Sequence, residues 1–220
     1  MKRSALAMFV IVMVSGAGSG FVCAGPLSGG PKLGMNLTNL YGSDVEESGF
    51  KSGVCLGAFM TFNISSVFAI QPELLYTQKG DKYEDEDEFF GTLKAWTMLD
   101  YLEIPILAKF SIPTKGKVTP NLFFGPAVAF KTRSKGRLEI EGLSVEVDIE
   151  DVSGVDLGLA LGAGVGIVAG PGEVVVDARY TLGLTSVDAS EWDMDVKNAA
   201  ISILVGYSFQ PKPKILQKVR

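Results

Sequence analysis

The segment "AIQPELLYTQKG", residues 69–80, constrains the fold most, because its side chains alternate in character. Every second residue from Ile70 to Tyr76 is apolar, and the intervening series is polar or charged apart from Leu75. Successive side chains of a β-strand point to opposite faces, so this pattern predicts a strand with one apolar and one charged face. The apolar face must then either fill a water-soluble core or meet lipid, with the charged face turned inward.

Similar strand-like runs recur along the chain, separated by turn clusters. No long helical periodicity intervenes, which favours an all-β domain built from sequential antiparallel hairpins. Eight strands are predicted, over residues 32–40, 53–63, 67–79, 96–111, 118–132, 154–168, 173–186 and 198–209.

The connections between these strands differ in length in a regular way. Those after the second, fourth and sixth strands are short, whereas those after the other strands are long and mostly acidic, including "YEDEDEFF" at residues 83–90. Bacterial outer-membrane barrels show this asymmetry, with short periplasmic turns and long outer loops. An even number of strands also places both termini at the periplasmic end. The acidic loops are interpreted as solvated and outward-facing.

The polar faces of the strands indicate which side is inside. They are rich in Gly, Ala and Ser rather than crowded with charge, and small residues suit the narrow lumen of an eight-stranded barrel. Their few charges balance, and a paired set of charges survives burial better than single ones. We therefore predict that the apolar faces meet lipid. The predicted lumen charge network is Glu73, Lys79, Glu103, Lys109, Lys131, Asp156, Asp177 and Arg179.

Aromatic residues near the strand ends fit the same interpretation. A strand of about ten residues tilted by about 40° covers the roughly 25 Å apolar band of an outer membrane, which aromatic girdles flank. The residues predicted for the two lipid interfaces are Tyr76, Trp96 and Phe130 near the long loops, and Phe62, Phe110, Tyr207 and Phe209 near the short turns.

Both ends of the chain differ from the barrel segment. Residues 1–24 combine a basic start, a short apolar run and small residues before a cleavage point after Ala24, which is typical of a signal peptide. Residues 25–209 form the predicted barrel domain, and residues 210–220 a basic periplasmic tail.

Composition excludes several classes of chemistry. The 220-residue chain has a net charge of −5, two cysteines and no histidine. Nucleic-acid binding, a Cys/His zinc site and catalysis by a histidine general base are therefore not expected. The dinucleotide-like "GVGIVA", residues 164–169, lies within a predicted strand and lacks the following helix. We predict no enzymatic activity, catalytic residue, cofactor or metal.

Six blocks in order, "KLGMNLTNL", "FAIQPELLYTQKG", "LDYLEIPILAKF", "FFGPAVAF", "LGLALGAGVGI" and "VVDARYTLGLTSV", resemble the PorT-like outer-membrane β-barrel family. The resemblance covers about residues 30–209. It implies an eight-stranded barrel in the outer membrane of a Gram-negative bacterium. Some members are linked to protein secretion, but a fold alone does not transfer that role. Here "QPKPKILQKVR" follows Phe209, which departs from the terminal aromatic that barrel-insertion machinery reads.

The sequence thus predicts an eight-stranded antiparallel up-and-down transmembrane β-barrel, exported to the outer membrane, with a structural or interaction role. Its expected contacts are outer-membrane lipids, the barrel-insertion machinery and a protein partner at the extracellular loops. One alternative is a narrow pore or a secretion-associated barrel. Another is a soluble lipocalin-like periplasmic carrier, which requires an apolar lumen and a polar exterior.

Overall fold

A computed structural model of the chain describes residues 27–45, 48–87, 91–140, 143–190, 192 and 194–209. The predicted signal peptide and basic tail lie outside these residues. Among the described residues, no helix has the length and apolar character needed to cross a bilayer. The strands are β1 Leu27–Tyr41, β2 Lys51–Asn63, β3 Phe68–Asp87, β4 Gly91–Ser111, β5 Val118–Ile140, β6 Leu143–Asp148, β7 Val155–Ala169, β8 Gly172–Gly183 and β9 Lys197–Phe209.

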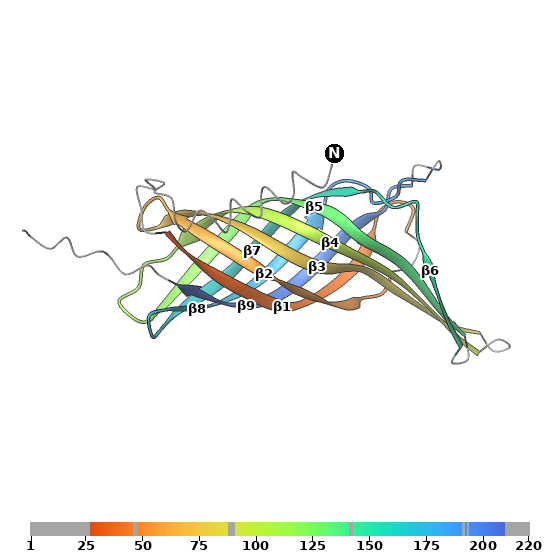
Figure 1. Cartoon of the computed structure of the whole chain (residues 1–220), viewed down its shortest axis with the longest axis horizontal. Helices are drawn as coiled ribbons and strands as arrows, with labels where there is room; N and C mark the ends of the chain where they lie inside the picture. Colours follow the sequence, from red (N-terminus) through yellow and green to blue (C-terminus); the bar gives the residue numbers. More distant parts are fainter. Residues whose placement is uncertain are drawn as a thin grey trace, which may run out of the picture.

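Eight of these strands close into an antiparallel barrel (Figure 1). The order around the wall is β4-β3-β2-β1-β9-β8-β7-β5, and pairing of β4 with β5 closes the ring. The first and last barrel strands, β1 and β9, are antiparallel neighbours. The predicted all-β, eight-stranded antiparallel fold is confirmed.

The barrel wall is apolar on the outside and polar on the inside. On β1, Leu33 and Met35 are 66% and 65% exposed, whereas Lys32 and Asn36, on the opposite face, are buried. On β3, Glu73 is completely buried. A soluble protein would bury the first set and expose the second. The arrangement is the reverse of the one that a lipocalin-like carrier requires, so that alternative is excluded.

The strands reach farther than the sequence pattern predicts at the end with the long connections. β3 continues to Asp87 and β4 begins at Gly91, although the sequence predicted a loop over residues 80–95. β5 likewise continues to Ile140 and pairs there with β6, a strand that the prediction lacked. The predicted outer loops are therefore partly wrong, because continued backbone pairing extends the hairpins beyond the barrel (Figure 1).

We call these extensions the protruding sheet, comprising residues 80–87, 91–100, 133–140 and 143–148. It begins where β5 parts from β7 after Phe130 and where a register shift interrupts the β4–β5 pairing between Asp100 and Tyr101. A bulge of this kind bends a sheet and raises its twist. The sheet thus leaves the barrel wall at its long-connection end, where Figure 1 shows it projecting.

The two faces of the protruding sheet differ sharply. Residues paired directly across antiparallel strands share a face. Lys82, Trp96 and Arg137 are in register across β3, β4 and β5, and they continue the barrel's outer surface. The opposite face carries apolar side chains on β5 and β6, including Leu138 and Val145, which are 44% and 61% exposed, and also Asp81 and Tyr83 of β3.

Candidate functional site

The middle of the lumen holds a buried ion cluster, which we call the Glu73 cluster. The Lys32 ammonium lies 2.8 Å from a Glu73 carboxylate oxygen and 2.6 Å from one of Asp177. Arg179 pairs with the other Glu73 oxygen at 2.8 Å, and Gln71 donates a hydrogen bond of 2.7 Å to Glu73. Two cations thus neutralise two carboxylates within a space closed to solvent. Such charge pairing makes buried charge tolerable, although Arg179 Nε and Asp177 Oδ1 have no hydrogen-bond partner among the described residues.

Aromatic rings and glycines give this cluster its room. Lys32 lies over the Phe59 ring at 4.7 Å and Arg179 over the Phe123 ring at 5.3 Å, in cation–π geometry. A Cβ atom on Gly162 would lie 2.6 Å from the Phe123 ring. A Cβ on Gly164 would lie 2.2 Å from the Asp177 carboxylate. The small residues of β7 therefore leave the space that the neighbouring large side chains occupy.

A second cluster, the Lys79 cluster, lies towards the long-connection end. The Lys79 ammonium is 2.7 Å from Glu103 and 3.7 Å from Asp156. Asn198 donates to Asp156 at 2.9 Å, and Lys79 also lies over the Tyr101 ring at 5.4 Å. All five side chains are buried. Four strands, β3, β4, β7 and β9, contribute to this cluster.

Apolar side chains fill part of the remaining lumen. Tyr101 and Leu107 have no exposed surface, and Leu75, Leu204 and Phe123 are almost as deeply buried. Tyr101 and Leu99 pack with Val187 at the long-connection end of the lumen. The interior of the barrel is thus a packed polar and apolar core, as a small barrel diameter favours.

The eight lumen residues predicted from the sequence divide into three groups. Glu73, Asp177 and Arg179 lie in the Glu73 cluster, and Lys79, Glu103 and Asp156 lie in the Lys79 cluster. Lys109 contacts the Glu73 cluster only through Gln71, and Lys131 lies in neither cluster, as described next.

Lys109 and Lys131 make no direct ion pair among the described residues, and their part in a lumen charge network stays a prediction. Lys109 is half-buried near the short turns, donates 3.2 Å to Gln71, and lines a small polar cavity with Glu173. Lys131 donates to the Val152 carbonyl, beyond the point where β5 leaves β7, and is in neither cluster.

Lys32 is the residue that the sequence reasoning missed. It is almost completely buried and bridges two carboxylates. The signal was present: Lys32, Gly34, Asn36 and Thr38 alternate with apolar residues in the first strand. The period-two alternation that places Glu73 on the lumen face therefore places Lys32 there as well.

The predicted interface aromatics lie on strands of the barrel wall or its extension. Phe110, Phe130 and Phe209 are exposed, and the other four are half-buried. Phe110 stacks on Phe124 with ring centres 6.1 Å apart, and Tyr207 meets Phe209 edge to face at 4.8 Å. The half-buried set is Phe62, Tyr76, Trp96 and Tyr207.

The acidic segments differ in their surroundings. Residues 83–87 belong to β3 rather than to a loop, and residues 88–90 lie outside the described part. Hydrogen bonds from Lys82 and Lys94 hold the pKa of Glu84 below its ordinary value. Trp192, in the β8–β9 connection, is 86% exposed. Among the described residues, no three potential metal ligands of the His, Cys, Asp or Glu type converge.

A family model described as "Outer membrane protein beta-barrel domain" matches residues 24–189, three-quarters of the chain. The chain belongs to this family. The barrel therefore resides in the outer membrane, and its exposed apolar wall meets lipid. The match stops before β9, which completes the barrel between β8 and β1. A search of curated protein sequences found no match.

Several solved outer-membrane proteins have a similar fold. Ail of Yersinia pestis, solved with the heparin analogue sucrose octasulfate, is 16% identical; the alignment covers 83% of this chain and 99% of Ail, with a TM-score of 0.43. Neisserial surface protein A is 14% identical, with coverages of 84% and 97% and a TM-score of 0.46. OprG of Pseudomonas aeruginosa is 11% identical, with coverages of 84% and 94% and a TM-score of 0.46. Likeness at this level carries no argument about function.

Proposed function

We propose that the protein is a non-catalytic, non-conducting outer-membrane barrel that presents its protruding sheet to the exterior for interaction. The observation that carries the proposal is the packed lumen, in which the Glu73 and Lys79 clusters lie among fully buried side chains such as Tyr101 and Leu107. Ions could pass only if these charge pairs separated inside the narrow barrel, and separating buried ion pairs is energetically costly.

The orientation follows from the usual asymmetry of such barrels, with short turns in the periplasm and long connections outside. In that orientation the protruding sheet and the exposed Trp192 extend from the cell. The apolar row of β6, in which Leu143 is 79% exposed, supports an interaction role for this end. A protein partner at the outer connections remains part of the proposal.

The absence of histidine from the sequence supports a non-catalytic role, because the common hydrolytic and acyl-transfer sites use this base. The sequence blocks that resemble PorT-like proteins make a secretion-associated barrel the alternative. The predicted signal peptide and the need for barrel-insertion machinery belong to the same proposal.

Conductance of the purified full chain in a planar bilayer tests the proposal. We expect no unitary current steps at neutral pH, because both clusters are intact. Reproducible single-channel steps would contradict the sealed lumen and favour the narrow pore. A protease added to whole cells tests the orientation: cleavage within the protruding sheet is expected, and protection of that sheet would reverse the assignment.

A further inference from the structure

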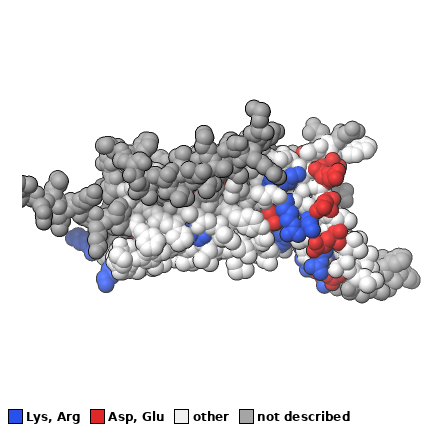
Figure 2. All heavy atoms as spheres, in the orientation of Figure 1, with Lys and Arg blue, Asp and Glu red and all other residues white. Residues whose placement is uncertain are grey.

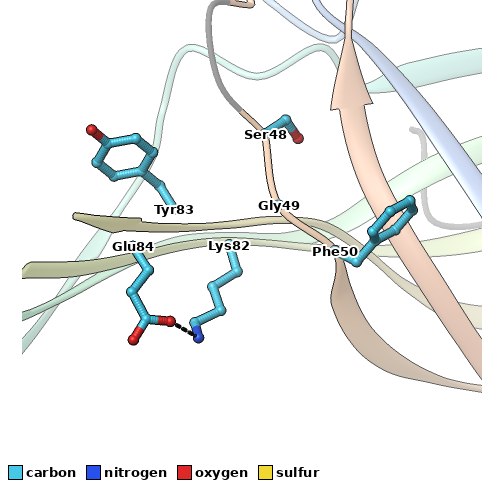
Figure 3. Close-up of a pocket in the computed structure, with 6 residues that line it drawn as sticks. All are labelled: Ser48, Gly49, Phe50, Lys82, Tyr83 and Glu84. Atoms are coloured by element: carbon cyan, nitrogen blue, oxygen red, sulfur yellow. Dashed lines mark hydrogen bonds and ion pairs between the residues drawn. The ribbon is translucent and has the colours of Figure 1, made fainter. Parts of the chain in front are cut away.

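A cavity of about 300 Å³ lies on the outer surface where β2 meets the protruding sheet. It is lined by Phe50, Lys51, Ser52, Lys82, Trp96, Met98 and Arg137. Three of these residues are basic and none is acidic. A second depression shares Phe50 and Lys82 with it, and Figure 3 shows Phe50 beside β3, with Lys82 and Glu84 extending from the same side of that strand.

An opening in the β2–β3 backbone pairing borders this cavity. The pairing of β2 with β3 runs out to Cys55 opposite Thr77, and farther out an isolated bridge joins Gly49 to Lys82. Gly80 lies between these points with a φ of 112°, a conformation that glycine adopts readily. The Lys51 ammonium occupies the opening and donates 2.9 Å to the Lys79 carbonyl.

The basic side chains around the cavity are only partly neutralised. Glu84 accepts from Lys82 and also lies 3.2 Å from Lys94, so two ammonium groups share one carboxylate. Arg137 lies 3.5 Å from Glu139. Lys51 has no ion pair among the described residues. Lys82, Lys94 and Arg137 thus share the carboxylates of Glu84 and Glu139, while Asp100 and Asp81 act on Lys51 from beyond ion-pair distance.

The hydrogen-bond donors and aromatic rings around the cavity have the geometry of an anion-binding site that is apolar on one side. The Arg137 guanidinium lies over the Trp96 ring at 5.5 Å, which orients its planar fork. Its Nε is buried and has no hydrogen-bond partner within the described ranges. Phe50 is 63% exposed beside it. Guanidinium and ammonium groups together favour phosphate, and arginine adds bidentate geometry.

The cavity also lies at the depth of a lipid headgroup. Val54 and Leu56 of β2, about half-exposed, belong to the apolar wall just below it. Figure 2 shows basic and acidic side chains gathered together where the uncharged surface of the barrel ends. A tryptophan at the edge of an apolar belt is typical of a membrane–water interface.

From these observations we infer that this cavity binds the phosphate group of an outer-leaflet lipid, with Lys82, Arg137 and Lys51 holding the phosphate. Trp96 and Phe50 pack against the carbon skeleton next to it. The inference rests on the proposed orientation, which puts the cavity at the outer leaflet, but it needs neither a sealed lumen nor a protein partner. Free phosphate has the same anionic chemistry and is the second source to be distinguished.

The test uses the full chain with Trp192→Phe in detergent micelles, so that Trp96 is the only tryptophan. Fluorescence is followed during titration with diphosphorylated lipid A, fully dephosphorylated lipid A, and inorganic phosphate. The variant is Lys82→Gln with Arg137→Gln. Its matched control is Lys115→Gln with Lys117→Gln, which makes the same charge change on exposed residues at the short-turn end.

We expect saturable binding of the phosphorylated lipid, at least tenfold weaker in the Lys82 and Arg137 variant and within twofold of the parent in the control. If inorganic phosphate displaces the phosphorylated lipid, the anion site is supported. Free phosphate is then sufficient for binding without the lipid. Equal binding of the dephosphorylated lipid, or an unchanged affinity in the variant, would overturn the inference.

A gel of unboiled and boiled samples shows whether each variant folds. Should the double variant lose its heat-dependent mobility shift, Lys82→Gln alone, at a half-exposed position, replaces it with an expected weakening of at least threefold. An unchanged affinity in that folded single variant overturns the inference as well.

Discussion

Replacement of Lys32 by methionine tests whether the Glu73 cluster stabilises the barrel. The change keeps the length of the side chain but removes the ammonium that lies 2.8 Å from Glu73 and 2.6 Å from Asp177. Glu73 keeps Arg179 at 2.8 Å, whereas Asp177 loses its direct ion pair and stays buried. Breaking a buried pair by removing one partner costs about 3–5 kcal/mol of unfolding free energy.

Urea unfolding in phospholipid vesicles, followed by tryptophan fluorescence, measures this loss. Lys117→Met is the matched control, because Lys117 is exposed in a short turn and should change stability by no more than about 0.5 kcal/mol. Adding Asp177→Asn to Lys32→Met removes the unpaired charge, and the double variant should regain about 1–3 kcal/mol relative to the single one. A loss below about 1 kcal/mol in Lys32→Met, or no recovery in the double variant, would refute the reasoning.

Three further predictions concern the wall, the lumen and the protruding sheet. Met35 is 65% exposed, so Met35→Arg would be harmless if this surface met water. Because the surface meets lipid, the change should destabilise the barrel by about 2–4 kcal/mol in urea titrations in vesicles, and a neutral result would contradict lipid contact. Gly162→Ala should cost about 1–3 kcal/mol in the same assay, because its new Cβ would lie 2.3 Å from the Ala178 carbonyl oxygen and 2.6 Å from the Phe123 ring; unchanged stability would contradict this close packing. The pKa of Glu84 is lower in the folded state than its ordinary value of 4.5. Its ion pairs should therefore stabilise the β3–β4 hairpin above pH 4.5, and this stabilisation should be lost as the pH falls further. Hydrogen exchange of that hairpin, corrected for intrinsic rates, should therefore accelerate on acidification in the parent but less in Glu84→Gln; equal pH responses would count against this.

Much of the barrel could be predicted from single-strand alternation. The period-two pattern of β3 separates Glu73 and Lys79, which are buried, from Leu74 and Tyr76 on the outer wall. This works because each face of a strand has a single environment. Which lumen charges pair could not be predicted, because Lys32 and Asp177 are 145 residues apart and meet only through the closed register of the barrel.

The protruding sheet was harder to predict because its segments carry the composition of loops. "LEIEGLSVEVD", residues 138–148, alternates apolar and acidic residues around a glycine, a hairpin pattern that its acidity obscured. The outer cavity was missed for another reason. Its lining comes from the start of β2 and from three extended strands, so no single stretch of sequence reveals it.

The Glu73 cluster also bears on how the barrel assembles. Lys32 is on β1, Glu73 on β3 and Asp177 on β8, so the set is complete only after β9 has joined the two ends of the wall. A half-assembled sheet holds the same charges without their partners, next to hydrocarbon, where unpaired ions are strongly disfavoured. Lys79 and Glu103 lie on adjacent strands and can pair earlier, whereas the pairs of Lys32 with Asp177 and of Arg179 with Glu73 join the two halves of the wall. The Glu73 cluster thus ties the first strands of the chain to the last ones across the lumen.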